Sequence, residues 1–209
     1  MIDAIINHIQ LNGLLGFFGG YLFGSIPFGL VLCALAGYGD IRKIGSGNIG
    51  ATNVLRTGNK ALAALTVLLD SSKGLIAVLI AAYFFDKHAM FGAALGAVIG
   101  HNFPVWLKFK GGKGVATTLG TYIALSWPVG LACCAAWLVT AFTSRISSLS
   151  ALVALGAAPF FVAWFGDPKQ LYLIGLISML GWMRHRTNIE RLIKGEEPKI
   201  NLKKKKEAA

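Results

Sequence analysis

The chain has 209 residues, of which 55% are hydrophobic and 14% are charged, and its mean hydropathy is +0.63. Soluble domains carry about 25% charged residues, so this composition excludes an ordinary soluble protein. The formal net charge is +11, but no contiguous basic helix with interleaved aromatic residues accompanies it, which argues against nucleic acid as a partner.

Seven apolar stretches can form membrane-spanning helices. A span needs about 20 mostly apolar residues, and shorter ones are possible where the helix is buried or the membrane is thin. The stretches cover residues 14–36, 61–85, 89–107, 114–128, 129–144, 149–165 and 170–183. We predict an all-α integral membrane protein with about seven transmembrane helices in a single membrane domain, residues 1–209. A short segment, 1–13, precedes the helices, and a flexible basic tail, 198–209, follows them.

Lysine and arginine fall in alternate loops between these stretches. Loop 37–60 contains four of them, loop 108–113 contains three, and residues 184–209 contain nine, whereas the intervening loops contain one, none and one. Short cytoplasmic loops are enriched in these residues, so we predict an N-terminus outside and a C-terminus in the cytoplasm. The chain begins without a basic segment, and we expect its first span to be retained.

Small residues inside the predicted helices indicate close packing. Gly92, Gly96 and Gly100 recur every four residues, a spacing that lets helix backbones approach closely in lipid. The three cysteines lie in apolar stretches and lack a Cys-x-x-Cys spacing, so neither a disulfide framework nor a metal site is predicted. We expect them to act as small buried apolar residues. The cysteines are Cys33, Cys133 and Cys134.

Two pairs of polar residues interrupt the spans. Asp70 and Lys73 are three residues apart in the second stretch, where they can pair. Ionisable residues inside a membrane usually face the bundle interior and serve function, so a structural ion pair and a catalytic role both remain open. His101 and Asn102 lie late in the third stretch, before Pro104, and we predict a capping or packing role for them.

The first of three glycine-bearing polar motifs reads Gly45-Ser46-Gly47-Asn48-Ile49-Gly50-Ala51-Thr52-Asn53. Its glycines allow backbone conformations in which successive N–H groups can surround an anion. A nucleotide-binding P-loop is excluded because Ala51 stands where that motif requires lysine. Arg56 follows and can bind a phosphate bidentately. The alternative is a flexible turn with Arg56 as a topology signal.

The second and third motifs suit the same chemistry. Lys110-Gly111-Gly112-Lys113-Gly114 combines an open backbone with a point charge, although Lys113 can also be a positive-inside anchor. Arg184-His185-Arg186-Thr187-Asn188-Ile189 contains a histidine that can transfer protons. Asn188 lies on the same helical face as His185. His185 and Glu190 also have a His-x4-acid spacing used by other acyltransferases, and a basic surface helix remains a further alternative for this segment.

These motifs resemble the bacterial acyl-phosphate:glycerol-3-phosphate acyltransferases. The resemblance runs from about residue 14 to residue 197 and rests on five stretches: GSGNIGATNVLRTG at 45–58, DSSKG at 70–74, GHNFPVW at 100–106, FKGGKGVAT at 109–117 and RHRTNIERLIKGEE at 184–197. It departs from the family pattern at Thr187, where relatives often carry a charged residue.

The resemblance implies transfer of a fatty acyl group from acyl phosphate to the sn-1 hydroxyl of glycerol 3-phosphate, yielding lysophosphatidic acid and phosphate. It also implies a bacterial cytoplasmic (inner) membrane enzyme surrounded by membrane lipid, with its active site facing the cytoplasm. Neither acyl-CoA nor acyl carrier protein is expected as donor, and no cofactor or metal is expected. The alternative from another class is a transporter of a small phosphorylated solute, against which stand the one-sided polar groups and the lack of a detectable inverted repeat.

By motif, the resemblance assigns catalytic roles to Ser46, Arg56, Lys113, His185 and Asn188. We expect substrate contacts from Gly45, Gly47, Asn48, Thr52, Asn53, Gly111, Gly112 and Gly114. Arg56 and Lys113 would neutralise phosphate, assisted by backbone N–H groups around Gly47 and Gly112. Ser46 and Asn188 would orient glycerol 3-phosphate. His185 would position the attacking hydroxyl or bind phosphate, and either His185 or a substrate phosphate would accept the proton.

Overall fold

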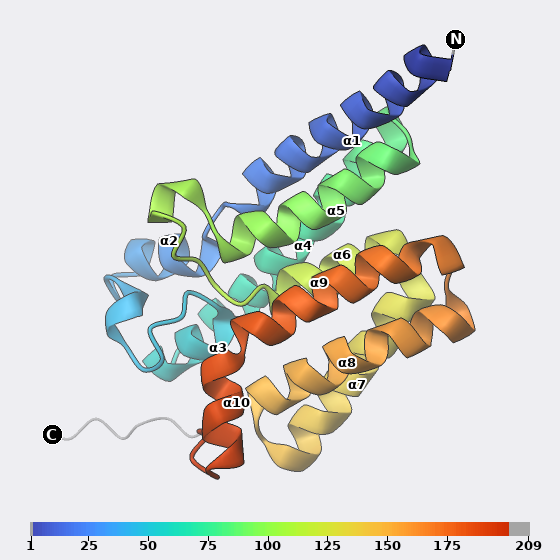
Figure 1. The fold of residues 1–209 in the computed structure, drawn as a ribbon. Helices are drawn as coiled ribbons and strands as arrows, with labels where there is room; N and C mark the ends of the chain where they lie inside the picture. Colours follow the sequence, from blue (N-terminus) through green and yellow to red (C-terminus); the bar gives the residue numbers. More distant parts are fainter. Residues whose placement is uncertain (1, 201–209) are drawn as a thin grey trace, which may run out of the picture.

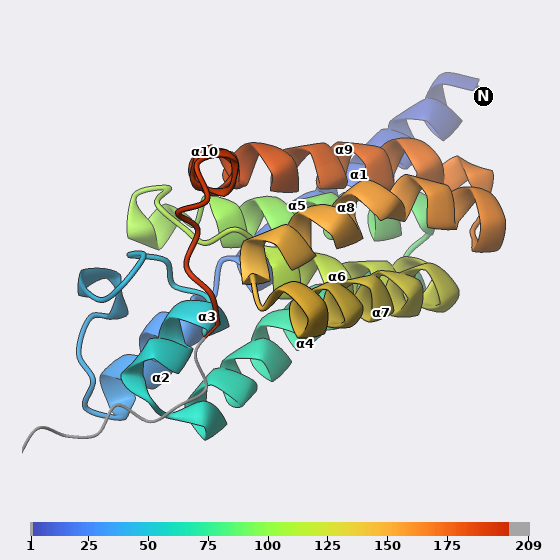
Figure 2. The same ribbon diagram turned by 90° about the horizontal axis from the view of Figure 1, so that it is seen from below.

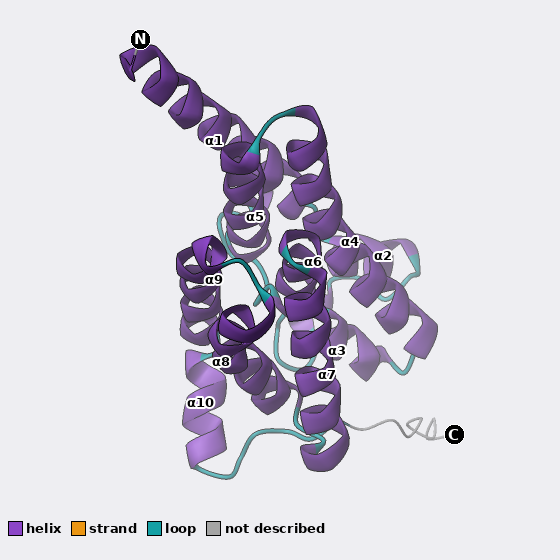
Figure 3. Cartoon of the chain, turned by 90° about the vertical axis from the view of Figure 1, so that its right-hand side faces the viewer, coloured by secondary structure: helices purple, strands orange, loops and turns teal. Residues whose placement is uncertain are grey.

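The computed structural model describes residues 2–200, with side chains from residue 10 onward. Every regular element in this part of the chain is a helix (Figure 3), which confirms the predicted all-α class. The α-helices are α1 (Ile2–Gly24), α2 (Phe28–Leu35), α3 (Ala51–Val54), α4 (Lys60–Phe84), α5 (Lys87–Asn102), α6 (Val115–Leu125), α7 (Trp127–Ser144), α8 (Ser147–Phe165), α9 (Leu171–Arg184) and α10 (Arg186–Ile193). Short 3-10 turns lie at Ile41–Lys43, Leu55–Thr57, Val105–Leu107 and Pro168–Gln170.

The long helices run between two ends of the molecule (Figure 1). Helix α1 lies beside α5, and α7 lies beside α8. The short helices α2, α3 and α10 gather at one end, together with the loops that carry the three motifs (Figure 2). The N-terminal end of α1 lies at the opposite end (Figure 1). All three polar motifs therefore share one end of the bundle.

Five segments are long and apolar enough to cross a membrane. They are Gln10–Leu35, Lys60–Phe84, Lys87–Leu107, Trp127–Ser144 and Ser147–Phe165. At a rise of about 1.5 Å per residue, α6 is about 16 Å long and α9 about 21 Å, both shorter than a hydrocarbon core of about 30 Å. Large apolar side chains such as Phe142 and Tyr172 are 87% and 86% exposed, as lipid contact requires. The protein is a multi-pass membrane protein, and seven complete crossings stay a prediction.

The first predicted span is interrupted. Helix α1 ends at Gly24 and α2 begins at Phe28, because Pro27 has no N–H group and disfavours helical geometry in the residue before it. The carbonyl oxygen of Ile26 in this break accepts a hydrogen bond of 2.7 Å from Lys73 Nζ. The break thus turns a backbone carbonyl toward the interior of the bundle.

Both predicted terminal segments differ from expectation. Residues 2–13 belong to α1 instead of forming a separate segment. Pro198 lines a cavity and the Ile200 N–H donates to the Arg145 carbonyl at 2.6 Å, so the first residues of the predicted tail pack on the bundle. Residues 201–209 lie outside the described part of the chain.

The glycine ladder of α5 packs against the backbone of α1. A Cβ atom added to Gly92, Gly96 or Gly100 would lie 2.1 to 2.2 Å from a carbonyl oxygen of α1, which leaves no room for a side chain. The predicted close approach is therefore confirmed. Cys33 and Cys133 are fully buried and Cys134 partly so, all as free thiols.

Candidate functional site

A cavity of about 860 Å³ opens at the end of the bundle where the three motifs meet. It is lined by twelve of the thirteen residues predicted for the site: Gly45, Ser46, Gly47, Asn48, Thr52, Asn53, Arg56, Gly111, Lys113, Gly114, His185 and Asn188. Gly112 is buried and does not line it. The structure thus brings together segments separated by more than one hundred residues, while the roles of these residues stay predictions.

Asn53 holds the first motif in shape. Its Oδ1 atom accepts from the Ser46 N–H at 3.1 Å and from Arg56 Nη1 at 3.2 Å. Its Nδ2 atom donates to the backbone carbonyls of Ile41, Ile44 and Asn48, at 2.9, 2.9 and 2.8 Å. Asn53 is 1% exposed, and all these bonds are internal. Its amide therefore fixes the shape of the loop, and its predicted substrate contact stays a prediction.

Gly45 leaves room for the Arg56 side chain to pass close to the backbone of the first motif. Its φ of +57° is a left-handed conformation that favours glycine. An added Cβ atom would lie 2.4 Å from Arg56 Nη1 and 2.6 Å from Asn53 Oδ1. The glycine therefore sets the path of the guanidinium to the cavity.

Two backbone N–H groups of the second motif bind carbonyls within the protein. The Gly111 N–H donates to the Asn102 carbonyl at 3.2 Å, and the Gly112 N–H donates to the His101 carbonyl at 3.1 Å. Arg184 Nη2 donates to the carbonyls of the same two glycines, at 3.2 and 3.0 Å. The second motif is therefore held from both sides, and the Gly112 N–H itself is used inside the protein. Phosphate binding by backbone N–H groups around Gly112 stays a prediction.

The first motif also uses a glycine N–H internally. The Gly47 N–H donates to the Ile44 carbonyl at 3.1 Å and closes a turn in which Gly47 has a φ of +70°. Gly47 and Gly112 therefore shape their loops through backbone conformation. The positive charge of the cavity comes from side chains.

Lys113 belongs to a network that ends at a buried carboxylate. Its ammonium donates to Asn188 Oδ1, and Asn188 Nδ2 donates to Glu197 Oε1 at 2.5 Å. Glu197 also accepts from Ser148 Oγ and from Arg191 Nε, both at 2.7 Å. Burial alone would raise the pKa of Glu197, but these hydrogen bonds lower it below the ordinary value. Glu197 is therefore ionised and orients Asn188 and Arg191.

The surroundings also change the pKa of Lys113. Burial lowers it from 10.5 to about 8, the Glu197 carboxylate opposes this change, and neighbouring arginines add to it. The arginine contribution is repulsion between like charges that line the same cavity. A phosphate in the cavity would relieve that repulsion.

His185 has a defined tautomer. Its Nδ1 atom lies 2.7 Å from the Gly181 carbonyl oxygen, which can only accept, so Nδ1 carries the proton and a neutral ring leaves a lone pair on Nε2. Burial lowers the pKa of His185 to about 4, against the effect of the Gly181 hydrogen bond. Glu190 instead lies 3.5 Å from Arg186 on the exposed face of α10. The His-x4-acid alternative therefore has no geometric support.

The polar residues inside the spans form one buried cluster. Lys73 Nζ lies 2.8 Å from Asp70 Oδ1, which confirms the predicted pair, and both residues are 3% exposed. His101 Nδ1 lies 2.9 Å from Lys73 Nζ. Asp70 and His101 line the cavity. His101 thus packs against an ion pair at the cavity wall.

Sequence reasoning missed several side chains of the site. Arg184 was noted only as part of a basic motif, and the roles of Ser148, Arg191 and Glu197 were not foreseen. Arg184 binds backbone carbonyls, and Glu197 is a carboxylate among cationic side chains. Neither contact produces a recognisable spacing of residues in the sequence. Their partners come from other segments of the chain.

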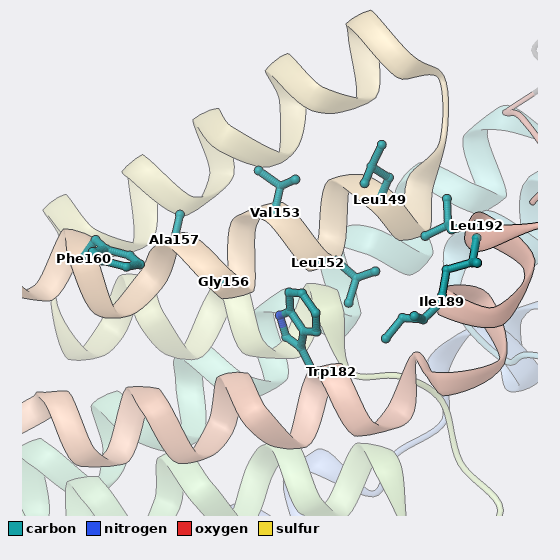
Figure 4. Close-up of a pocket in the computed structure, with 10 residues that line it drawn as sticks. Leu149, Leu152, Val153, Gly156, Ala157, Phe160, Trp182, Ile189 and Leu192 are labelled. Carbon is teal, nitrogen blue, oxygen red and sulfur yellow. The ribbon is translucent and has the colours of Figure 1, made fainter. Parts of the chain in front are cut away.

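A second, apolar groove of about 500 Å³ lies between α8, α9 and α10 (Figure 4). Trp182 projects from α9 toward α8, and Ile189 and Leu192 come from α10. Its lining consists of Leu149, Leu152, Val153, Gly156, Ala157, Phe160, Trp182, Ile189, Leu192 and Ile193. None of these residues lines the larger cavity. The groove is therefore distinct from the cationic site.

Comparison with known proteins identifies the family. Residues 14–195 match the family model described as glycerol-3-phosphate acyltransferase. The glycerol-3-phosphate acyltransferase of Paramagnetospirillum magneticum is 60% identical, over 91% of this chain and 94% of that protein. The enzyme of the same name from Rhodospirillum rubrum is 58% identical, over 89% of this chain and 90% of that protein.

Solved structures give the same answer. The crystal structure of PlsY (YgiH), an integral membrane glycerol 3-phosphate acyltransferase, in its glycerol 3-phosphate form superposes with a TM-score of 0.85. That chain is 40% identical, and the match covers 90% of this chain and 96% of the other. Its lysophosphatidic acid form gives a TM-score of 0.83 at 39% identity, over 91% of this chain and 96% of the other. With the family model spanning most of the chain and the fold shared over nine-tenths of it, this protein belongs to the glycerol-3-phosphate acyltransferase family.

Proposed function

We propose that this protein transfers a fatty acyl group from acyl phosphate to the sn-1 hydroxyl of glycerol 3-phosphate, releasing lysophosphatidic acid and phosphate. The observation that carries the proposal is a single cavity in which Arg56, Lys113 and His185 meet. Support also comes from the 40% identical PlsY, which was solved in glycerol 3-phosphate and lysophosphatidic acid forms. Two phosphate-bearing substrates require a concentration of positive charge of this kind.

Arg56 and Lys113 neutralise phosphate in this proposal. Arg56 lines the cavity and is exposed, so its guanidinium is accessible to a ligand. Asn188 acts mainly as a positioning residue, because both of its amide atoms bind protein groups, Lys113 and Glu197. Ser46 is exposed and its hydroxyl makes only a long contact of 3.4 Å to Asn53. That hydroxyl can rotate toward glycerol 3-phosphate.

The acyl chain follows the apolar wall of the same cavity. Val67, Leu119 and Trp137 come from three helices and line the cavity together with the cationic groups. A chain laid along this wall keeps its acyl phosphate carbonyl at the cationic end. The lining of the groove in Figure 4 contains no cationic side chain. An acyl chain in that groove would therefore not hold its carbonyl beside the cationic groups.

The reaction is a direct transfer. The sn-1 oxygen forms a bond to the acyl carbonyl carbon, the carbon–oxygen bond to phosphate breaks, and the hydroxyl proton leaves with the departing phosphate. A ring with a pKa of about 4 is a weaker proton acceptor than a phosphate, whose second pKa is about 6. We therefore assign the proton to a phosphate oxygen. His185 orients the attacking hydroxyl through its Nε2 lone pair.

Catalysis then rests on orientation and charge stabilisation. Acyl phosphate already carries a good leaving group, so an acyl-enzyme intermediate is not required. We place the enzyme in the bacterial cytoplasmic membrane with this cavity facing the cytoplasm, because the lysine- and arginine-rich loops surround it.

The test is product formation by purified protein. Phosphate and lysophosphatidic acid are measured with glycerol 3-phosphate and palmitoyl phosphate, and palmitoyl-CoA and palmitoyl-acyl carrier protein are supplied in parallel reactions. We expect both products from palmitoyl phosphate alone, with the acyl group at sn-1. Turnover with a thioester but not with palmitoyl phosphate would overturn the donor assignment. No turnover with any donor, in folded protein, would overturn the reaction and call for a solute-flux assay in proteoliposomes.

A further inference from the structure

The last turn of α5 holds two polar side chains that the proposed mechanism does not use. His101 and Asn102 are 4% and 0% exposed and lie beneath the second motif. A Cβ atom added to Gly112 would lie 2.2 Å from His101 Nε2, and one added to Gly114 would lie 2.7 Å from Asn102 Oδ1. Glycine at these two positions therefore leaves the polar atoms below uncovered.

Lys73 determines which nitrogen of His101 carries the proton. Its Nζ atom lies 2.8 Å from Asp70 Oδ1, 2.7 Å from the Ile26 carbonyl oxygen and 2.9 Å from His101 Nδ1. An ammonium group paired with a carboxylate has three donors and no lone pair. His101 Nδ1 must then accept, and the proton of the neutral ring lies on Nε2. This tautomer is the opposite of that in His185.

The Nε2–H group of His101 lacks a hydrogen-bond partner among the residues that the structure describes. The hydrogen bond that the ring makes inside the protein is the one at Nδ1, so Nε2 is the atom left to bind a group in the cavity. The ring lines the cavity, as does Lys113 in the adjacent loop. A ligand that supplies a hydrogen-bond acceptor would give the Nε2–H group its partner.

We propose that His101 is a further substrate-binding residue, which donates Nε2–H to a phosphate oxygen of the substrate held beside Lys113. This inference rests on the proposed function, because that function supplies the phosphate. His101 and His185 then have complementary roles: one donates to phosphate and the other accepts from the hydroxyl. The Asp70–Lys73 pair fixes the donor tautomer.

Two substitutions separate the two ring nitrogens. Gln at position 101 can place an amide N–H near the former Nε2, whereas Asn can place an acceptor near the former Nδ1 and has no donor at Nε2. For His101→Asn we expect the KM of the contacted substrate to rise about tenfold to hundredfold, the worth of a hydrogen bond to a charged group. We expect a smaller change in kcat, and recovery of much of the affinity in His101→Gln. Measuring KM separately for glycerol 3-phosphate and palmitoyl phosphate identifies which phosphate is bound.

A merely structural role predicts the reverse order. His101→Asn would retain the contact with Lys73 and behave like wild type, and His101→Gln would lose thermal stability and activity. That order, or wild-type KM values in both variants, would overturn the proposal. Because the wild-type assay of product formation is separate, such a result would leave the proposed function standing.

Nitrogen-15 NMR of histidine-labelled wild-type protein tests the proposed role of His101 directly. The measurement needs no variant, so it does not depend on whether the variants fold. We expect the His101 ring to be neutral with its proton on Nε2, and its signals to shift when glycerol 3-phosphate, palmitoyl phosphate or inorganic phosphate is added. A proton on Nδ1, or signals that none of the three phosphates moves at saturation, would contradict the assignment.

Discussion

At the scale of single residues, two arginines flank the first motif and differ in their surroundings. Arg56 lines the cavity, whereas Arg42 lies outside it and pairs with Asp40 at 2.7 Å. We predict that Arg56→Ala lowers kcat/KM by about 10²–10³-fold, in the range for loss of one group that stabilises developing charge. Arg56→Lys should remain impaired, because an ammonium cannot bind phosphate bidentately.

Arg42→Ala is the matched control, since it removes the same charge from the same loop. Steady-state kinetics in detergent, with thermal melting to confirm folding, measure all three variants. Equal kcat/KM values for Arg56→Ala and Arg42→Ala would show that Arg56 does not bind substrate.

The lowered pKa of Lys113 makes a pH prediction. Its ammonium loses its proton as the pH rises through about 8, and only the charged form neutralises phosphate. We therefore predict that kcat/KM falls with a limb near pH 8, because this parameter reports the free enzyme. The substrate phosphate is already a dianion in that range, given a second pKa of about 6.

Lys113→Arg should lack this alkaline limb, because arginine does not titrate below about pH 12. The measurement is kcat/KM for glycerol 3-phosphate from pH 7 to 9.5 in both proteins. A limb that persists unchanged in the arginine variant would assign it to another group.

The site could be predicted from sequence only as a set of residues. Glycines, cationic side chains and loop positions predict three anion-binding motifs on one side of the membrane. The family resemblance singles out Arg56, Lys113 and His185, which line one cavity in the structure. Backbone hydrogen bonds cannot be read from composition, so the engagement of the Gly47 and Gly112 N–H groups was missed. The same limit hid Glu197, whose partners come from α8 and α10.

At the scale of helices, adjacent glycines in α1 differ in their surroundings. A Cβ atom at Gly20 would lie 2.3 Å from the Ala93 carbonyl oxygen of α5, and one at Gly19 would meet nothing within 4 Å. We predict that Gly20→Ala destabilises the protein by about 1–3 kcal/mol through overpacking. Gly19→Ala should be neutral or stabilising, because alanine favours a helix by about 1 kcal/mol over glycine.

Thermal melting of the two variants in the same detergent compares them directly. Equal melting temperatures would mean that α1 and α5 can separate without cost. This contact was foreseeable from α5, where the four-residue spacing is regular. The reciprocal surface of α1 was less evident, because its glycines are mixed with exposed apolar residues such as Leu22.

Helix ends were harder to predict than helix existence. Hydropathy joins α1 and α2 into one stretch, since Ile26 and Pro27 do not lower the apolar average, but proline still ends the hydrogen-bond ladder. Hydropathy likewise extends α6 to residue 128, whereas Ser126 separates it from α7. Mean hydropathy reports how apolar the side chains of a segment are. It does not detect where the backbone hydrogen bonds of a helix are interrupted.

At the scale of the whole molecule, the cavity and the basic loops share one end. The chain leaves α9 at this end, and α1 begins at the other (Figure 1). If the seven helices α1 and α4 to α9 all cross the bilayer, the described chain begins and ends on opposite sides. The short α6 then requires a locally thin membrane or burial among its neighbours, and Thr117, Thr121 and Tyr122 in α6 are indeed fully buried.

The topology itself can be tested with one cysteine at each end. Lys60 begins α4 a few residues after the first motif, Lys169 lies in the turn before α9, and both are exposed. In a cysteine-free background, made by replacing the three native cysteines with alanine, we predict that Lys169→Cys reacts with a membrane-impermeant maleimide on intact cells. Lys60→Cys should react only after lysis.

Retained acyltransferase activity of both variants is the control for folding. The reverse labelling pattern would place the cavity outside the cell, where cytoplasmic glycerol 3-phosphate could not reach it. Labelling of both sites on intact cells would mean that the two ends are not separated by the bilayer. The predicted pattern requires that the same basic loops determine the orientation of the chain in the membrane and supply the charge that binds phosphate. Correct insertion of the chain then also places the cavity on the side of the membrane that holds its soluble substrate.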